Sequence, residues 1–227
     1  GKQWDDARRM LEAFVSRFMS TAREADLVLV ADTGSTDGTV AALRAEGAEV
    51  HSITISPWRF DDARNASLAL VPGDFDVCVA IDLDEVLSPG WRAALEAGWG
   101  DATRGRYSYA WSHHPDGSPA LTYVYDRIHA RRGYRWRHPC HESLYPDRIE
   151  ERYAELDLEL HHWPDPAKPR SQYLALLAVA TEEAPLDSRM AHYYGRELMF
   201  FGRDQEAVAE LRREGQGVAI LAFGTLL

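Results

Sequence analysis

The sequence predicts an α/β fold in residues 1–165, with a mixed, mainly parallel sheet flanked by helices, and a helical extension in residues 166–227. Short apolar runs alternate with amphipathic stretches as far as Asp82, and this order of elements builds a parallel sheet covered on both faces. Beyond Gly105, aromatic runs of period two are typical of antiparallel strands, and beyond Pro166 the pattern becomes helical. With 45% apolar residues, the chain of 227 residues can bury a sizeable core.

The first half of the chain alternates between helices and strands. Apolar residues recur every three or four positions between Trp4 and Ala25, which predicts an amphipathic helix. Later runs of short, branched side chains have the composition of strands, and the run at residues 77–81 is expected to be a central strand buried on both faces. We therefore expect helices over residues 4–25, 40–46 and 61–70, and strands over residues 26–31, 48–55 and 77–81.

The second half begins with a helix start signal, in which Ser88 is the expected N-cap and Pro89 the first helical residue. Alternation in the strand expected over residues 153–163 places His161 and His162 on opposite faces. Residues 191–208 resemble one tetratricopeptide unit, which must stack on another element to bury its faces. The further strands expected are 106–111 and 121–125, and the helices are 173–183, 188–201 and 204–213.

The net charge and the number of cysteines limit the classes of function that the sequence allows. The chain has 36 acidic and 25 basic residues, so its net charge of −11 opposes bulk attraction to nucleic acid or anionic lipid. Two cysteines cannot form a disulfide framework, and we expect them to be reduced in the cytoplasm. The sequence shows neither a signal peptide nor a run of about eighteen apolar residues, so no membrane span is expected.

Three acidic side chains follow the strand expected over residues 77–81. Asp82, Asp84 and Glu85 lie at the carboxyl end of that strand, where open α/β sheets bind ligands. These carboxylates repel one another near an apolar core, and a divalent cation would relieve that repulsion. The alternative is an acidic loop that faces water.

Three landmarks in order carry a resemblance to a known family. Residues 32–39 (DTGSTDGT), 60–68 (FDDARNASL) and 82–87 (DLDEVL) resemble the signature of family 2 glycosyltransferases of the GT-A fold. Residues 139–142 (PCHE) and 161–163 (HHW) are similar to the branch of that family with tetratricopeptide-like helices behind the catalytic domain. One departure is that no strand ending in an Asn-Glu pair precedes Trp4; in the family that strand helps to shape the pocket for the nucleotide base.

The resemblance implies a metal-dependent, inverting transfer of a sugar from a nucleotide-diphosphate donor to an acceptor hydroxyl or similar nucleophile. A UDP-sugar is the favoured donor, and the acceptor stays open among a glycan, a peptide, a lipid and a modified nucleic-acid base. Asp84 and Glu142 are the implied catalytic residues, with Glu142 as the general base. The implied donor-binding residues are Asp32, Gly34, Ser35, Arg64, Asn65 and Asp82, and the implied ligands of Mn²⁺ or Mg²⁺ are Asp82, Asp84 and His161.

Each of these roles has a structural alternative. Asp32 is also suited to cap its turn, and Arg64 to pair with Asp61 or Asp62. A histidine in a strand is often structural, and Glu142 is also suited to anchor its loop through a His–Glu contact. At the level of the whole protein, the alternatives are a catalytically inactive domain that binds a nucleotide-sugar or a protein partner, and a nucleotidyltransferase.

Overall fold

The computed structural model describes residues 2–164 and 172–218, and the chain divides into two compact units. The boundary expected at residue 165 differs from this division, because the unit that holds the C-terminal helices also takes in two segments from the expected catalytic part. The first unit comprises Gly1–Ile55, Ala63–Arg135 and Leu144–Pro166, and the second comprises Ser56–Asp62, Trp136–Ser143 and Ala167–Leu227.

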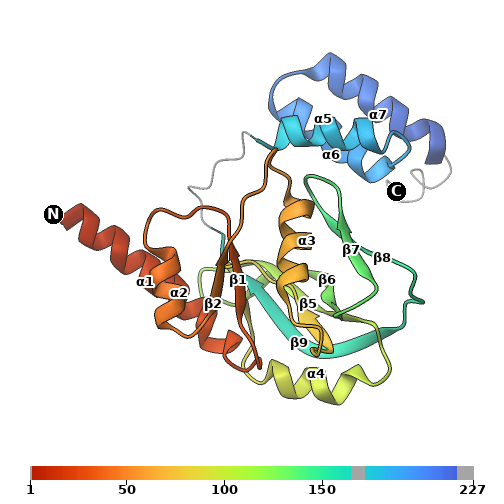
Figure 1. Ribbon diagram of the computed structural model, residues 1–227. Helices are drawn as coiled ribbons and strands as arrows, with labels where there is room; N and C mark the ends of the chain where they lie inside the picture. Colours follow the sequence, from red (N-terminus) through yellow and green to blue (C-terminus); the bar gives the residue numbers. More distant parts are fainter. Residues whose placement is uncertain (1, 165–171, 219–227) are drawn as a thin grey trace. The chain divides into compact units, whose positions relative to one another are not determined.

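The first unit opens with a helix packed on a small parallel sheet. It contains α1 (Lys2–Ala22), β1 (Leu29–Asp32), α2 (Thr39–Ala45) and β2 (Glu49–Ser52), and Figure 1 shows them in red and orange. β1 and β2 are paired in parallel, as expected for two strands joined by a helix. Their apolar side chains and those of α1 and α2 form one core, whose buried members are Val15, Phe18, Met19, Ala22, Leu43, Ala48 and Val50.

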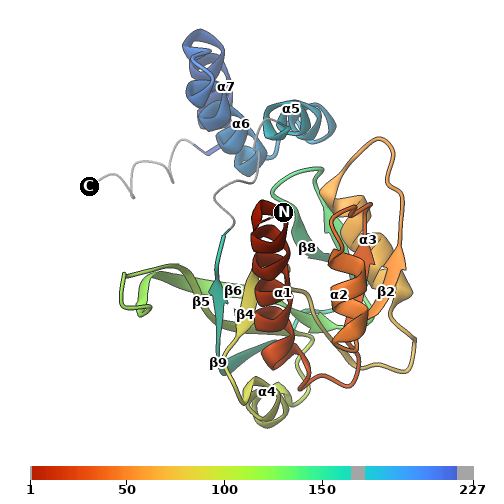
Figure 2. The same ribbon diagram turned by 90° about the vertical axis from the view of Figure 1, so that its left-hand side faces the viewer.

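A second core lies under a five-stranded sheet of order β3-β6-β5-β9-β4. Within it β5 and β9 run parallel, while β3–β6, β5–β6 and β4–β9 are antiparallel, and α4 packs against β9 (Figure 2). The fold is therefore mixed α/β. The elements are β3 (Val77–Val79), β4 (Glu85–Leu87), α4 (Trp91–Trp99), β5 (Arg104–His113), β6 (Pro119–Ala130) and β9 (Tyr153–His162).

The prediction that residues 77–81 form a central strand of one parallel sheet is wrong. β3 covers only the start of that run, lies at the end of the five-stranded order and is half-buried. The physical reason is the length of β6, whose residues Ile128–Ala130 supply an antiparallel partner for β3. The end of this run is still partly buried, because Ile81 packs against both cores.

The start of α4 also differs from expectation. The helix begins at Trp91, so Ser88 is not its N-cap; Gly90 occupies that position with φ 83° and no side-chain cap. The carboxylate of Glu24 takes over the capping role, since it accepts hydrogen bonds from the backbone N–H groups of Gly90 at 2.9 Å and Arg92 at 3.3 Å. The cap therefore comes from a residue distant in the sequence.

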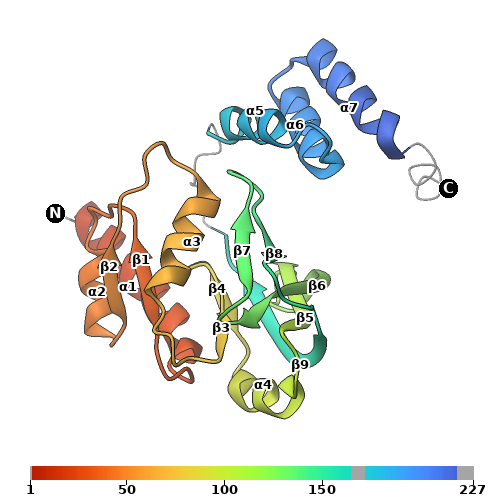
Figure 3. The same cartoon turned by 45° about the vertical axis from the view of Figure 1, so that its right-hand side comes forward.

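Figure 3 shows α5, α6 and α7 of the second unit; the first two match the expected ranges closely, while α7 continues to Val218, beyond the expected end at residue 213. α6 and α7 pack tightly at Gly195, where an added Cβ would lie 2.7 Å from Cγ of Leu211. The sequence ends in an apolar tail, residues 218–227, to which no structure was assigned, and residues 219–227 of it lie outside the described residues. The remaining elements are α3 (Phe60–Leu70), β7 (Tyr134–Arg137) paired with β8 (Ser143–Pro146), α5 (Tyr173–Glu183), α6 (Ser188–Phe200) and α7 (Asp204–Val218).

Among the residues that the structure describes, none of the helices is both long enough and apolar enough to cross a membrane.

The buried His129 on β6 predicts a loss of stability in acid. Burial lowers the pKa of His129 to about 4, helped by the charges of Arg104 and Arg131 and opposed by a hydrogen bond to the Ala130 carbonyl. The unfolded chain takes up this proton near pH 6.5, so stability is lost as the pH falls from 6.5 towards 4. We expect a loss of roughly 2 kcal/mol between pH 6.5 and 5 from this residue.

Urea unfolding at several pH values checks this expectation on wild type and His129→Gln. The wild-type free energy of unfolding should fall more steeply with acid than that of the variant. Equal slopes for the two proteins would remove His129 as the cause.

Candidate functional site

The Asp82–Glu85 turn connects β3 to β4 between the two cores of the first unit. The backbone N–H of Ala80 donates to the Arg127 carbonyl at 3.1 Å, and the N–H of Glu85 donates to the Asp82 carbonyl at 3.0 Å. Glu85 then opens β4 and stands opposite His162 in β9. The turn is thus fixed at both ends by strands, which holds its carboxylates in defined positions.

Two arginines hold the side chain of Asp82. Nη2 of Arg64 donates to both carboxylate oxygens, at 2.9 and 3.0 Å, and Nη1 of Arg127 donates to Oδ2 at 3.2 Å. The two alternative partners of Arg64, Asp61 and Asp62, both pair with Arg59. Asp82 is therefore neutralised by arginines, an arrangement that sequence spacing did not reveal.

The side chain of Glu85 binds the backbone of this turn. Its buried carboxylate accepts the Asp82 backbone N–H at 2.8 Å and the Tyr109 hydroxyl at 2.7 Å, and Nη1 of Arg127 lies 3.9 Å away. Burial and the nearby charge of Asp82 raise the pKa of Glu85, against the effect of Arg127. The sequence did not indicate Tyr109 or Arg127 as site residues. A tyrosine in an aromatic strand is usually a core residue, and an arginine on a strand usually faces solvent.

Asp84 faces His162. Oδ2 of Asp84 lies 3.7 Å from Nε2 of His162, and both side chains are largely buried, with 14% and 11% of their surface exposed. Nδ1 of His162 lies 3.3 Å from the carbonyl oxygen of Trp111, and the ring stacks on the Trp111 indole at 4.5 Å. The Asp84 carbonyl accepts the Trp163 N–H at 2.7 Å. A hydrogen bond from Nδ1–H to the carbonyl leaves Nε2 to face Asp84.

This pair attracts positive charge. Burial alone would lower the pKa of His162, but the carboxylate of Asp84, 3.7 Å away, and the hydrogen bond to the Trp111 carbonyl outweigh burial and raise the pKa. The Asp84 carboxylate therefore favours the protonated form of the His162 imidazole.

His161 points the other way, so its predicted place beside Asp84 is corrected. Its Nε2 lies 3.2 Å from Ser88 Oγ and 3.2 Å from Glu159 Oε2, and its Nδ1 lies 3.0 Å from Nε2 of His113. The expected alternation of the strand is present, but the antiparallel register with β4 turns His162 towards Asp84.

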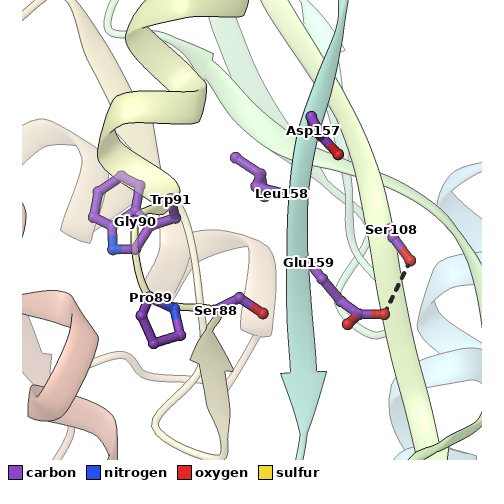
Figure 4. Close-up of a pocket in the computed structure, with 8 residues that line it drawn as sticks. All are labelled: Ser88, Pro89, Gly90, Trp91, Ser108, Asp157, Leu158 and Glu159. Carbon is purple, nitrogen blue, oxygen red and sulfur yellow. Dashed lines mark hydrogen bonds between the residues drawn. The ribbon is translucent and has the colours of Figure 1, made fainter.

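A cavity of about 380 Å³ lies beside β9 and the start of α4 (Figure 4). Glu159 and Ser108 form a hydrogen bond of 3.4 Å at its wall. None of the residues predicted to bind donor or metal lines this cavity. It is therefore separate from the Asp84–His162 pair.

The turn after β1 is closed on itself. The carboxylate of Asp32 accepts the backbone N–H groups of Gly34 at 3.1 Å and Ser35 at 3.2 Å, and Thr39 is capped by Asp37 in the same way. Burial would raise the pKa of Asp32, but the hydrogen bonds with Ser35 and Gly34 outweigh it and lower the pKa. The carboxylate of Asp32 thus caps its own turn by accepting these N–H groups.

The two remaining predicted residues lie on different units. Asn65 follows Arg64 on α3 in the first unit, whereas Glu142 lies in the segment Trp136–Ser143 of the second unit. Both side chains are half-buried.

The Asp84–His162 pair does not by itself make a metal site of the protein. Within the described residues, no three His, Cys, Asp or Glu side chains are grouped so that they could hold a metal ion. Mg²⁺ is commonly bound through one or two protein groups together with substrate phosphates and water. Asp84 supplies such an oxygen and His162 an imidazole nitrogen, which favours Mn²⁺ over Mg²⁺.

A scan against models of protein families and a search of the curated proteins find no match for this chain. The functional argument therefore rests on the residues and their geometry.

Proposed function

We propose that this protein is a metal-dependent glycosyltransferase that moves a sugar from a nucleotide-diphosphate donor to an acceptor nucleophile. The observation that carries the proposal is that the largely buried carboxylate of Asp84 faces the His162 imidazole, which stacks on the Trp111 ring. Asp84 is the second aspartate of the Asp-x-Asp pattern, which is one part of the resemblance to family 2 glycosyltransferases.

The chemistry assigns separate tasks to the charged residues. Asp84 and His162 would hold the divalent ion, and Asp82 is kept in place by Arg64 and Arg127. When bound, the ion supplies charge stabilisation to the diphosphate as it leaves.

Glu142 is the proposed general base. In an inverting transfer, the bond from the anomeric carbon to the acceptor oxygen forms while the bond to the diphosphate oxygen breaks. The proton of the acceptor then passes to a carboxylate, the role given to Glu142.

Ligand-dependent melting tests the proposal with a matched pair of variants. We expect the melting temperature of the wild type to rise when UDP or a UDP-sugar is added with Mn²⁺, because a ligand that binds only the folded state stabilises it by about 2.7 kcal/mol at 100 times its Kd. His162→Gln should lose the shift that requires Mn²⁺. His161→Gln, the adjacent residue on the other strand face, should keep it.

A shift without Mn²⁺, equal shifts in both variants, or no shift with any nucleotide would contradict the metal-dependent donor site. A shift without cleavage of the donor would favour a binding scaffold over an enzyme.

A further inference from the structure

Two arginines and a tyrosine share one face of α6 in the second unit. Arg189, Tyr193 and Arg196 are spaced four and three positions apart, which places their side chains on the same face of a helix. The centroid of the Tyr193 ring lies 5.3 Å from Cζ of Arg189 and 4.9 Å from Cζ of Arg196. Two positive charges are therefore held next to one aromatic ring.

Acidic residues do not neutralise these two charges. Among the residues that the structure describes, neither Arg189 nor Arg196 forms an ion pair with a carboxylate. The carboxylate of Asp187 is engaged elsewhere, since it lies 3.3 Å from Nε2 of His138 and caps the N-terminus of α6. Glu197 directly follows Arg196, but consecutive side chains point about 100° apart around a helix. The positive charge of the pair is thus unbalanced within the described residues.

Both arginines also have a buried nitrogen that lacks a hydrogen-bond partner among the described residues. Nη2 of Arg189 donates to the His141 carbonyl at 2.6 Å, but its Nη1 has no such partner, and neither has Nε of Arg196. Burying a charged donor without an acceptor costs free energy. Both residues are half-buried, so solvent still reaches part of each. A ligand that accepts hydrogen bonds and carries negative charge would remove this cost.

We propose that Arg189 and Arg196 bind a phosphate group. The planar guanidinium group matches the oxygens of a phosphate through paired N–H donors. A phosphate monoester carries a charge of about −1.5 to −2 at pH 7, so one such group balances both arginines, whereas a carboxylate balances only one. The net charge of the whole chain is −11, so attraction of a phosphate depends on these local charges. The inference does not rest on the proposed glycosyltransferase activity.

Calorimetric titration of the full-length protein with inorganic phosphate tests the site. Divalent metal is left out and sodium chloride keeps the ionic strength constant, so screening does not change during the titration. We expect saturable binding by the wild type and at least about tenfold weaker binding by Arg196→Gln, because a charge-assisted hydrogen bond is lost. Arg203→Gln is the matched control, since it removes a positive charge from the same unit, where Arg203 pairs with Glu206. It should bind phosphate as the wild type does.

Melting temperatures distinguish a ligand site from a structural role. Arg196 forms no hydrogen bond or ion pair with the described residues, so Arg196→Gln should melt no lower than the wild type without phosphate. Added phosphate should raise the melting temperature of the wild type and of Arg203→Gln, but not that of Arg196→Gln. If Arg196→Gln fails to fold, Arg189→Lys is titrated instead. It keeps a positive charge but loses the planar donors, and it should also bind phosphate at least about tenfold more weakly.

Three results would overturn the inference: no phosphate binding by the wild type, equal binding by a folded Arg196→Gln, or an equal loss in Arg203→Gln. Acetate tests the chemical class, and acetate binding as tight as that of phosphate would contradict a site for a doubly charged group. Because phosphate is titrated without Mn²⁺, its result is independent of the Mn²⁺-dependent shift with UDP, and either proposal can fail while the other stands.

Discussion

Asp84→Asn is expected to abolish metal-dependent cleavage of the donor, with a fall of roughly 10³-fold. The metal contributes several kcal/mol of charge stabilisation to the departing diphosphate, and about 1.4 kcal/mol corresponds to a factor of ten in rate. The variant keeps the shape of the side chain but loses the charge that raises the pKa of His162. Cleavage rates across a series of Mn²⁺ concentrations measure the effect.

Asp82→Asn is the informative control because it also removes one carboxylate charge from the turn. Its loss leaves Arg64 and Arg127 without their shared ionised partner, so the main effect should be a lower melting temperature. Asp84→Asn removes an ion pair with the single partner His162, so its melting temperature should fall less than that of Asp82→Asn. Undiminished Mn²⁺-dependent cleavage in Asp84→Asn would defeat the metal assignment.

Glu142→Gln should slow sugar transfer by about 10²–10⁴-fold, the usual contribution of a general base. Gln keeps the shape and much of the hydrogen bonding of Glu but cannot accept the proton. Donor binding should survive. Cleavage with water as the acceptor should fall less, because solvent offers other proton acceptors. Transfer rates and donor Kd on one preparation separate these effects.

The structural alternative for Glu142 makes the opposite prediction. If Glu142 only anchored its loop, the Gln variant would lose stability and keep near-normal turnover. His138 and His141 contact Asp187 and Tyr193 of α6, so the loop has other anchors. We therefore expect Glu142→Gln to fold normally, and near-wild-type transfer with intact donor binding would exclude it as the base.

The local spacing of apolar residues was sufficient to predict most of the helices and the strands beyond Gly105. The predicted range 173–183 matches α5, and the predicted alternation of residues 153–163 matches β9, where Leu156, Leu158 and Leu160 are buried. These elements are decided by the spacing of apolar residues, which is a property of neighbours in the chain.

Pairing between distant segments was not predictable in the same way. Nothing local to residues 77–79 indicates that β6 would pair with them and leave them at the end of a sheet. The arginine that shares Asp82 with Arg64 lies 45 residues away in the sequence, and so its role emerged only from the fold. Glu24 capping α4 is a further case.

The sequence by itself determined the mixed α/β composition, the position of the acidic turn after an apolar strand, and the fact that His161 and His162 face opposite sides of their strand. Only the tertiary structure decided which histidine meets Asp84. That choice depends on the register between β4 and β9, in which Glu85 stands opposite His162. A shift of one residue in a strand exchanges its two faces, and the register is set by packing between segments far apart in the chain.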